Sequence, residues 1–279
     1  MRVTVLGTAG ASPYADRVQT GVLVEAPPVR LLIDCGSGIT HRLAALDHAW
    51  KDITHVALTH FHSDHTIDFV ALIVAWKWGQ LPQRTEPLTL IGPVGVGAFV
   101  QRLTELYNEP FGQLPFPIQI VELAPGSSSD LRPQTSDLSS DLRPQTSDLP
   151  DFRPQTSDLA IEAFKVPHSL ESVAYSVSGG GARFVFSGDT GHDEAFAKWA
   201  AGSDLLLLEC SLPDELAIPM HLTPRQCGAL AAIAQPKLLA LTHFYPPVED
   251  VDIRGQVAEA FDGSIALCGD GWSWSAEEN

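Results

Sequence analysis

The chain is poor in charged residues and poorer still in basic ones. Charged side chains make up only 18% of its 279 residues, and 17 Lys and Arg stand against 34 Asp and Glu, for a formal net charge of -17. Nucleic-acid binding depends on Lys and Arg that neutralise backbone phosphates, so this balance disfavours a broad nucleic-acid-binding surface. A local basic patch remains compatible with it, and bound cations would offset part of the acidity.

Long apolar runs and cysteine motifs are also lacking. No uninterrupted apolar stretch approaches the roughly 18 residues that a membrane-spanning helix needs. The chain opens directly with a strand pattern, not with the charged and apolar regions of a secretory signal, so we expect a cytoplasmic protein with no membrane partner. The cysteines are Cys35, Cys210, Cys227 and Cys268. Without C-x-x-C spacing they predict neither a zinc knuckle nor a disulfide framework; we expect buried thiols, with Cys210 near a metal as the alternative.

What the sequence does contain is a dense group of ligand-type side chains. The heptapeptide Thr-His-Phe-His-Ser-Asp-His directly follows Ile53–Leu58, an apolar run typical of a buried strand. Unpaired polar groups are costly in a core, and metal binding would compensate for that cost. On an extended strand end, His60 and His62 point the same way and could bind one ion. Asp64 and His65 follow where the chain must turn and could reach a second ion. The alternative is a histidine-rich surface loop.

Apolar periodicity and turn residues predict the regular elements. Strands are expected at Val3–Leu6, Gly21–Glu25, Arg30–Asp34, Ile53–Leu58, Leu88–Pro93, Ile118–Leu123, Ala160–Val166, Ala174–Ser178, Arg183–Phe186, Asp204–Glu209, Leu238–Thr242 and Ile265–Leu267. Helices are expected at Ile39–Leu46, Thr66–Trp78, Val96–Leu106, Glu194–Ala201, Thr223–Ala234 and Val251–Ala260. Gly269–Asn279 is predicted to be a short tail. This order indicates an α/β chain with two halves, each a sheet covered by helices.

A short unit is repeated in the middle of the chain. Ser129–Leu138 recurs nearly verbatim at Ser140–Leu149 and again at Asp151–Leu159. The period is too short for a helical solenoid, and units rich in Pro, Ser, Thr and Asp cannot build a core. We expect residues 127–158 to be a disordered or loosely extended loop inserted into a hairpin, with little selected function. A partner-binding or substrate-binding arm is the alternative.

The histidine-rich segment resembles the signature motif H-x-H-x-D-H of the metallo-β-lactamase superfamily. Three later landmarks of that family follow in order at Val166–Ser169, Phe186–Gly191 and Leu241–Phe244. The resemblance covers nearly the whole chain apart from the repetitive insertion. It implies one domain, residues 1–279, folded as a four-layer αβ/βα sandwich in which two mixed β-sheets are flanked by helices. The metals would lie at one edge between the sheets.

The resemblance also implies the ligands of two divalent ions. These are His60, His62 and His168 for the first ion, Asp64, His65 and His243 for the second, and Asp189 bridging them. Imidazoles and carboxylates without a thiolate suit Zn, our first expectation, and also Mn or Fe. Two ions about 3.5–4 Å apart can hold a bridging hydroxide and polarise a substrate oxygen, which predicts a hydrolase.

A further histidine indicates which bond is cleaved. In the ribonuclease Z-like and phosphodiesterase branches of the family, a His precedes a Thr or Ser between an apolar strand and the final metal His, and Met220–Thr223 resembles that pattern at His221. There the His stabilises charge on the phosphate or protonates the leaving oxygen, and Glu209 fits the acid that orients it. We expect His221, Glu209 and Asp64 to be catalytic. The alternative is a helix-start His bound only to backbone.

Two other features lie where the family places supporting groups. Asp34 matches an Asp that orients the metal ligands from behind, and its alternative role is to cap the helix Ile39–Leu46. The loop Gly7–Pro13 would lie near the rim of the active site; by itself it indicates only a turn at a sheet edge, since it does not match a P-loop.

The sequence therefore predicts a dinuclear metal-dependent phosphodiesterase with a small or unidentified substrate. A lactonase or carboxylic ester hydrolase is the first alternative, because the same hydroxide attacks a carbonyl carbon. A ribonuclease Z-like transfer RNA endonuclease is disfavoured: only Tyr175–Phe186 stand where that enzyme carries its long arm, and the chain is acidic. A non-catalytic metal-binding interaction protein is a third reading. A homodimer is the usual arrangement in the resembling branch.

Overall fold

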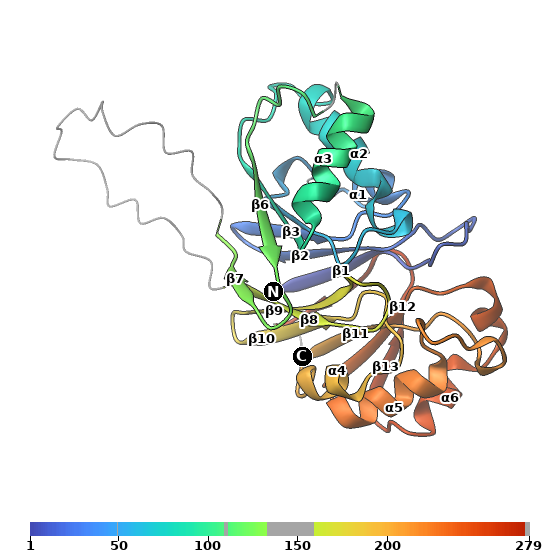
Figure 1. Cartoon of the computed structure of the whole chain (residues 1–279). Coiled ribbons are helices and arrows are strands. Elements are labelled where there is room, and N and C mark those ends of the chain that lie inside the picture. The colour runs from blue at the N-terminus through green and yellow to red at the C-terminus, as the bar shows by residue number, and fades with distance from the viewer. Residues whose placement is uncertain (49, 109–110, 133–158, 277–279) are drawn as a thin grey trace.

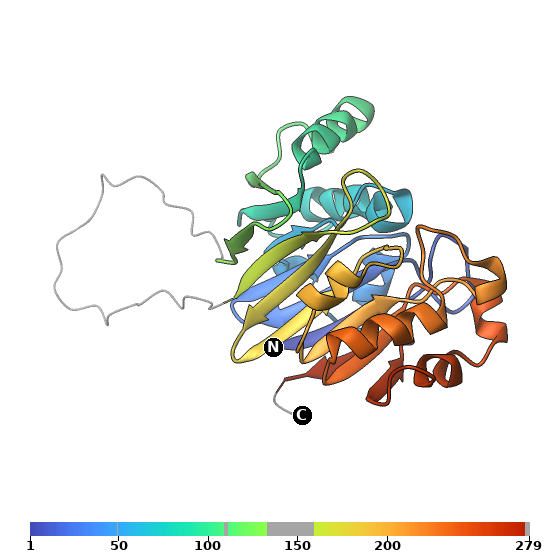
Figure 2. The same cartoon turned by 60° about the horizontal axis from the view of Figure 1, so that its bottom comes forward.

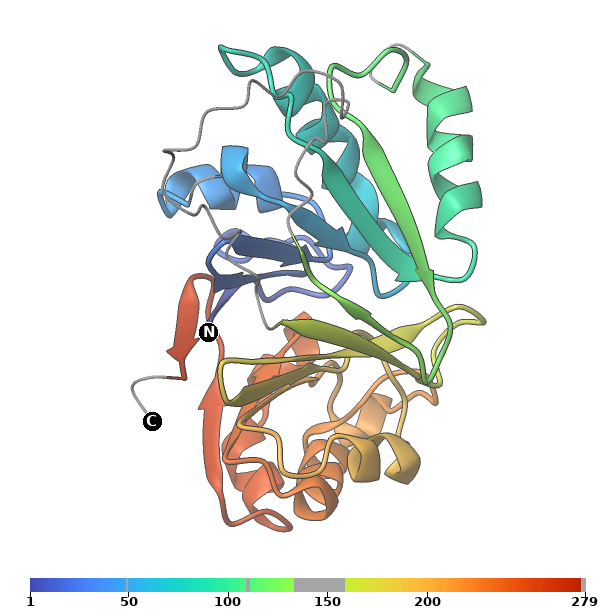
Figure 3. The ribbon, with the colours of Figure 1, turned by 90° about the vertical axis from the view of Figure 1, so that its left-hand side faces the viewer.

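Two β-sheets pack face to face, and helices cover the outer face of each sheet (Figures 1 and 3). The structure is a computed structural model, and it describes residues 1–48, 50–108, 111–132 and 159–276. The first sheet contains the N-terminal strands and one C-terminal strand, and the second sheet contains the rest. The predicted α/β sandwich of two mixed sheets flanked by helices is confirmed.

The first sheet has the strand order β14-β1-β2-β3-β4-β5-β6. Its strands are β1 (Arg2–Gly7), β2 (Gly21–Ala26), β3 (Val29–Ile33), β4 (His55–Ala57), β5 (Leu88–Pro93), β6 (Ile118–Leu123) and β14 (Trp272–Ser275). Pairing is antiparallel from β14 to β3 and parallel from β3 to β6. Strands β4 and β5 are buried along their whole length, as expected for parallel strands covered on both faces.

The second sheet has the order β13-β12-β11-β10-β9-β8-β7 and the same division. Its strands are β7 (Ser128–Asp130), β8 (Ala160–Lys165), β9 (Val173–Gly179), β10 (Ala182–Phe186), β11 (Leu205–Glu209), β12 (Leu238–Thr242) and β13 (Ser264–Leu267). Pairing is antiparallel from β7 to β10 and parallel from β10 to β13. The order of parallel strands brings the carboxyl ends of β10, β11 and β12 to one edge.

Six α-helices of the described chain form the outer layers, and Figure 2 shows α4, α5 and α6 over one face of the second sheet. The helices are α1 (Ile39–Ala45), α2 (Ser63–Trp78), α3 (Val96–Tyr107), α4 (Glu194–Trp199), α5 (Pro224–Ala234) and α6 (Ile253–Ala258). Short 3₁₀ turns are η1 (Trp50–Asp52), η2 (Asp214–Leu216) and η3 (Pro246–Asp250). Among the described residues, each helix is too short or too polar to cross a lipid bilayer.

Three apolar clusters join the four layers. The central cluster lies between the sheets and combines, for example, Val24 of β2 with Val177 of β9. The outer clusters pack Phe69 of α2 against the first sheet and Phe196 of α4 against the second. Each large apolar side chain buried in this way contributes about 1.5–3 kcal/mol, so the layers are held mainly by apolar burial.

The C-terminal segment contains a strand, and the prediction of a tail is wrong there. Strand β14 pairs antiparallel with β1, with Trp274 opposite Val3. Trp274 is buried in the central cluster, whereas the neighbouring Ser273 is exposed. The Trp-Ser-Trp-Ser alternation has the two-residue period of a half-buried strand, but four residues are too few to predict a strand by themselves.

The repetitive insertion also begins later than predicted. Ser128–Asp130 form β7, with Asp130 opposite Ala160 of β8. Beyond this pair, Leu131 and Leu159 are both buried in the central cluster, and the Leu131 N–H donates to the Leu159 carbonyl at 2.8 Å. The ladder therefore extends to the first leucine of the repeat, because that side chain completes the core. The rest of the predicted loop, residues 133–158, lies outside the described residues.

Helix α2 begins at Ser63, three residues before the start that we predicted. His62 is the N-cap residue, and Asp64 and His65 lie in the first turn. An acidic side chain in the first turn is favoured by the helix dipole. The Thr66 hydroxyl donates to the His62 carbonyl at 2.9 Å, which closes this turn. The expected non-helical turn is therefore wrong, and the helix fixes the directions of these side chains.

Candidate metal centre

The strands deliver the candidate ligands to one edge of the sandwich. His60 follows β4, His168 follows β8, Asp189 follows β10 and His243 follows β12. These strands belong to both sheets, and their carboxyl ends meet where the sheets face each other. The carboxyl ends of parallel strands are the usual place for ligand binding in α/β folds.

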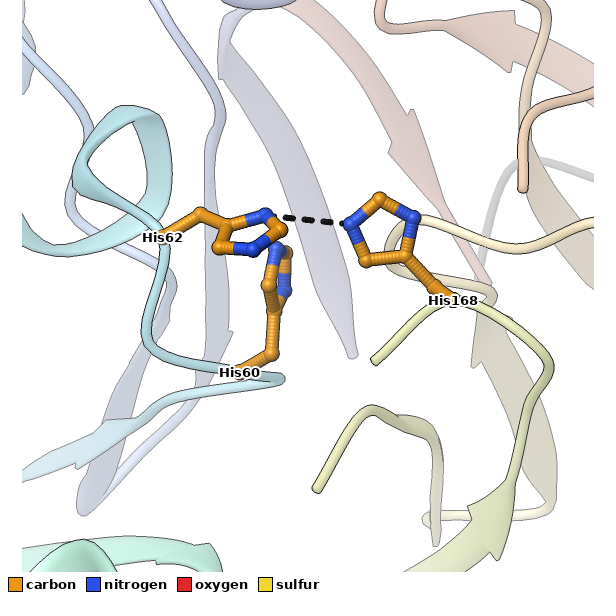
Figure 4. Close-up of side chains that lie close together, drawn as sticks. All are labelled: His60, His62 and His168. Carbon is orange, nitrogen blue, oxygen red and sulfur yellow. Dashed lines mark hydrogen bonds between the residues drawn. The ribbon is translucent and has the colours of Figure 1, made fainter. Parts of the chain in front are cut away.

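Three histidines form the first candidate ligand set (Figure 4). His60 and His62 follow β4 of the first sheet, and His168 follows β8 of the second sheet. His168 Nε2 and His62 Nδ1 are 3.1 Å apart. The His60 ring centroid lies 4.6 Å from that of His62 and 4.9 Å from that of His168. Three converging imidazoles are suited to one zinc-like ion.

Two carboxylates and two histidines form the second set. Asp189 Oδ1 lies 3.1 Å from His65 Nε2 and 3.1 Å from His243 Nε2. Asp64 Oδ2 is 3.8 Å from His65 Nε2 and 3.6 Å from His243 Nε2. All four side chains are buried. The arrangement is suited to a second ion.

Asp189 lies between the two sets. While Oδ1 faces the second set, Oδ2 lies 3.9 Å from His60 Nε2 and 3.7 Å from His168 Nε2. One carboxylate thus presents an oxygen to each group of histidines. The structure brings together all seven residues that the resemblance implied as ligands, in the two groups expected.

Several buried atoms here make no hydrogen bond within the described chain. They are His60 Nε2, His65 Nε2, His243 Nε2 and Asp189 Oδ1. The short contacts to Asp189 do not have hydrogen-bond geometry. An unsatisfied buried polar group costs about 1–3 kcal/mol, so four of them at one place call for a common partner. Divalent cations would supply that partner, and the donor set suits Zn, Mn or Fe.

Burial and charge set the protonation of the histidines. Burial holds the pKa of His60 well below its usual range and also lowers the pKa of His168. Both imidazoles therefore have a lone pair for a cation. Burial would lower the pKa of His65 too, but the carboxylates of Asp189 and Asp34 raise it well above the ordinary value. A cation bound at His65 would displace that proton.

Asp34 orients the ligands that follow β4. Its Oδ2 lies 2.7 Å from His65 Nδ1, and the N–H and hydroxyl of Thr59 each donate to its carboxylate at 2.8 Å. The Thr59 hydroxyl is also 3.1 Å from His60 Nδ1. Helix α1 is preceded by Gly38 in the left-handed region and has no side-chain cap, so the capping role considered for Asp34 is wrong. The contacts fit the other role, support of the ligands.

The outward nitrogens of two other histidines are also occupied. His168 Nδ1 lies 3.0 Å from the Met220 carbonyl, and His243 Nδ1 lies 2.9 Å from the Ser211 hydroxyl. Because Nδ1 is engaged in each case, Nε2 faces the candidate ions. Ser211 was not predicted. Its only sequence signal is its position two residues after the acid that ends β11.

Glu209 connects several of these groups from a fully buried position. Its Oε1 accepts a hydrogen bond from the Thr190 N–H at 2.6 Å, and its Oε2 accepts from the Leu222 N–H at 3.2 Å and from the Ser211 hydroxyl. Its two oxygens lie 3.0 and 3.1 Å from His221 Nδ1. The His221 ring is therefore held by a carboxylate, as expected for Glu209, and the alternative of a His bound only to backbone is wrong.

His221 faces both ligand sets. Its ring centroid lies 5.0 Å from that of His168 and 5.5 Å from that of His243. Burial lowers its pKa, but the hydrogen bond to Glu209 and the charge of that carboxylate outweigh burial and raise the pKa to about 9. Bound cations would oppose this rise. Nδ1 is held by Glu209, so Nε2 is the atom that can donate a proton at the site.

The glycine-rich loop predicted at the rim contacts the loop that carries His243. The Gly10 N–H donates to the Phe244 carbonyl at 2.9 Å, and a Cβ at Gly10 would lie 2.4 Å from Cε2 of Tyr245. The Tyr245 ring centroid lies 5.7 Å from that of His243 and 5.8 Å from that of His221. Sequence reasoning missed Tyr245, because only the fold brings it beside His221.

Cys210 does not belong to any candidate ligand cluster in the described residues. It is buried in the cluster beneath the second sheet, near Cys227, whose thiol donates to the Glu209 carbonyl at 3.1 Å. Its burial agrees with the predicted role as a small apolar side chain.

The chain is similar to known proteins over nearly its whole length. Ribonuclease Z of Mycolicibacterium gilvum (strain PYR-GCK) is 29% identical over 302 residues, which cover 96% of this chain and 93% of that protein. Ribonuclease Z of Thermoplasma acidophilum is 27% identical and covers 91% and 89%, respectively. The crystal structure of the metallo-beta-lactamase fold protein YhfI from Bacillus subtilis superposes with a TM-score of 0.77, at 22% identity over 98% of both chains.

The family match spans the whole candidate centre. Residues 29–244 match the family model described as a beta-lactamase superfamily domain. This range contains all seven candidate ligands as well as Glu209 and His221, and it ends one residue after His243. The predicted resemblance is confirmed: the chain belongs to the β-lactamase superfamily and is similar to its ribonuclease Z-like branch.

Proposed function

We propose that the protein is a dinuclear metal-dependent phosphodiesterase. The superfamily supports a metal-dependent hydrolase, and the finer assignment rests on the residues around the centre. His60, His62 and His168 would hold one ion, Asp64, His65 and His243 the other, and Asp189 would contact both. When bound, two such ions lower the pKa of a water molecule and polarise a substrate oxygen, with Zn as the first choice and Mn or Fe as alternatives.

The Glu209–His221 pair is the observation that favours a phosphodiester. Displacing an alkoxide from phosphorus leaves an oxygen that needs a proton, and a positioned acid typically contributes 10²–10⁴-fold to such a step. The His221 ring faces the ligand sets, and its Nδ1 is bound by the buried Glu209 carboxylate. Burial lowers the pKa of His221, but the hydrogen bond and charge of Glu209 outweigh burial and favour the protonated imidazole. Glu209 orients the ring and stabilises its charged form. Burial raises the pKa of Asp64, but His243 and His65 together lower it below the ordinary value, so Asp64 is ionised beside the second set.

The proposal is tested with substrates that differ in the atom attacked. Metal-reconstituted protein is assayed with bis-p-nitrophenyl phosphate, p-nitrophenyl acetate and a lactone. We expect hydrolysis of the phosphodiester to be fastest and to fall about 10²-fold or more in His221→Ala, with a much smaller change for the ester. His41→Ala is the control, because His41 is exposed on α1. Equal losses on phosphate and ester, or preference for the lactone, would favour the carboxylic ester hydrolase instead.

A ribonuclease acting on transfer RNA precursors is the second candidate. It is favoured by one observation, the full-length similarity to proteins named Ribonuclease Z. The net charge of -17 and the short β9–β10 connection, Gly180–Gly181, weigh against it. Incubation with a precursor transfer RNA decides the point: accurate 3′-end cleavage at a rate above that of the small diester would make this the function.

A further inference from the structure

An apolar cleft of about 820 Å³ is lined in part by residues from two segments that also carry candidate metal ligands. Its walls come from α3, from the turn Pro93–Gly95 that precedes α3, and from the loop between β8 and β9. Phe61 lines it from the middle of the H-x-H-x-D-H motif, and Leu170 lines it two residues after the candidate ligand His168. The cleft is therefore connected to the first ligand set by two separate segments of the chain.

Unusually exposed apolar side chains surround this cleft. Leu170 is 97% exposed, Leu106 is 73% exposed and Val94 is 60% exposed. Beneath them, the rings of Phe61 and Phe99 stack with centroids 4.8 Å apart and an interplanar angle of 8°. Single exposed apolar residues need no explanation, but a contiguous group around one concavity marks a binding site.

The loop that carries Leu170 is held in place. The Lys165 ammonium donates to the carbonyls of Ser169, Leu170 and Ser172 at 2.6, 2.9 and 3.3 Å. The Ser169 N–H also donates to the Ser172 hydroxyl at 3.1 Å. This loop thus uses a lysine and its own polar groups to present a leucine to solvent, which an ordinary surface turn does not require.

The opposite wall is fixed in a similar way. Glu122 of β6 accepts hydrogen bonds from the N–H groups of Gly95 and Gly97, each at 3.1 Å, and so holds the start of α3 beside Val94. Gly95 has φ +106°, a conformation that favours glycine. The cleft is therefore preformed, and binding there would cost little ordering of the backbone.

The charge at the cleft suits an anionic ligand. Arg102 lines the cleft and is exposed, and its guanidinium makes no hydrogen bond or ion pair with another described residue. Lys165 is committed to the loop carbonyls, so Arg102 is the cation available to a ligand. The chain has only 17 basic residues, so an unpaired cation at this cleft favours a ligand that carries negative charge. Glu171 also lines the cleft and would disfavour a second negative charge there.

We propose that this cleft binds the apolar ester group of an anionic substrate whose phosphate lies at the candidate metal centre. The inference rests on the proposed phosphodiesterase function and narrows it to diesters with an aryl or alkyl group on the side that does not leave. The walls offer few hydrogen-bond partners beyond Arg102 and Glu171, so a nucleoside would bury its polar edges unpaired there. An apolar group meets no such cost.

The experiment holds the leaving group constant. Methyl, phenyl and thymidine-5′ esters of p-nitrophenyl phosphate are compared in metal-reconstituted protein by kcat/KM. We expect the phenyl ester to exceed the methyl ester by about tenfold or more, because burial of a ring removes substantial apolar area from water. Leu170→Ser and Val94→Ser should lose most of that preference while retaining the rate for the methyl ester. Leu81 is 90% exposed and lies outside the cleft, so Leu81→Ser is the matched control.

A binding measurement separates this inference from the function on which it rests. Phenylphosphonate and methylphosphonate are titrated into the wild type and Leu170→Ser by calorimetry. The wild type should bind phenylphosphonate more tightly than methylphosphonate, and Leu170→Ser should bind the two with similar affinity. If no diester is hydrolysed, the phosphodiesterase assignment fails and the phosphonate ratio alone decides whether the cleft binds apolar anions. Equal rates and equal affinities for methyl and phenyl compounds would overturn the inference, as would a preference for the thymidine ester that Leu170→Ser does not change. A dimer that Leu106→Ser dissociates without any change in the substrate series would also overturn it, because a second copy would then occupy the cleft.

Discussion

Acid should destabilise this fold in part through His55, the first residue of β4. His55 is buried, and its Nδ1 lies 2.8 Å from the Thr54 hydroxyl. Burial lowers its pKa from 6.5 to about 4, although a hydrogen bond with the backbone of Arg132 acts in the opposite direction. The unfolded chain therefore takes up a proton on this side chain before the folded chain does. Stability is complete above the unfolded pKa and falls as the pH decreases from 6.5 towards 4.

The size of the effect follows from the two pKa values. A shift of one unit corresponds to about 1.4 kcal/mol, so the whole window amounts to about 3 kcal/mol. Between pH 7 and pH 5, where most carboxylates stay ionised, the loss attributable to His55 is about 2 kcal/mol. This is a large part of the 5–15 kcal/mol by which a typical domain is stable.

The assay compares urea unfolding of the wild type and His55→Gln at pH 7 and pH 5, with a chelator present so that metal release does not contribute. Glutamine keeps polar atoms at the site but does not titrate. We expect the variant to lose about 2 kcal/mol less than the wild type over this interval. His41→Gln removes an exposed histidine and should behave as the wild type. Equal losses in wild type and His55→Gln would refute the reasoning.

Three other predictions concern the centre, the insertion and α5. Elemental analysis should find close to two metal ions per chain, and His60→Ala should reduce that number and abolish turnover; an unchanged metal content would contradict the ligand assignment. Replacing residues 133–158 with a short Gly-Ser linker should preserve hydrolysis and the melting temperature, because Leu131 and Leu159 already meet across the ladder; loss of hydrolysis would favour an interaction role for the repeats. Thr223→Ala should lower the free energy of unfolding by about 1 kcal/mol by removing the capping box of α5, whereas Thr223→Ser should retain most of it in a denaturant titration.

The parts of the fold that the sequence predicted well have strong local periodicity. The apolar run of β11, the Thr-Pro start of α5 and the Gly-Gly turn between β9 and β10 each carry their own signal, and the structure has all three close to the expected bounds. The start of α2 was misplaced because His62 is not a common N-cap residue. Strands β7 and β14 were missed because each is short and gains its stability by pairing with β8 or β1 rather than from propensity.

The candidate site was also predicted in part and missed in part. The ligand set was implied by the resemblance of four short motifs to those of a known family, and the structure brings all seven residues to one edge. Ser211 and Tyr245 were missed, since a lone Ser or Tyr carries no pattern and acts here only through its contact with His243 or His221. The role of Asp34 was left open between two alternatives, because one residue at a strand end can serve either a helix or a neighbouring loop. Its three contacts, to His65 and twice to Thr59, settle that question only in three dimensions.

Each ligand set draws side chains from both halves of the sandwich: His60 and His62 oppose His168, while Asp64 and His65 oppose Asp189 and His243. Ions held in this way would link the two sheets to each other. A ligand that binds only the folded state at 100 times its Kd adds about 2.7 kcal/mol to stability. Chelation should therefore weaken the contact between the two sheets before either half unfolds. Hydrogen exchange should then rise first in the loops that follow β4 and β12. In this architecture, catalytic competence and cohesion of the two halves would depend on the same pair of cations.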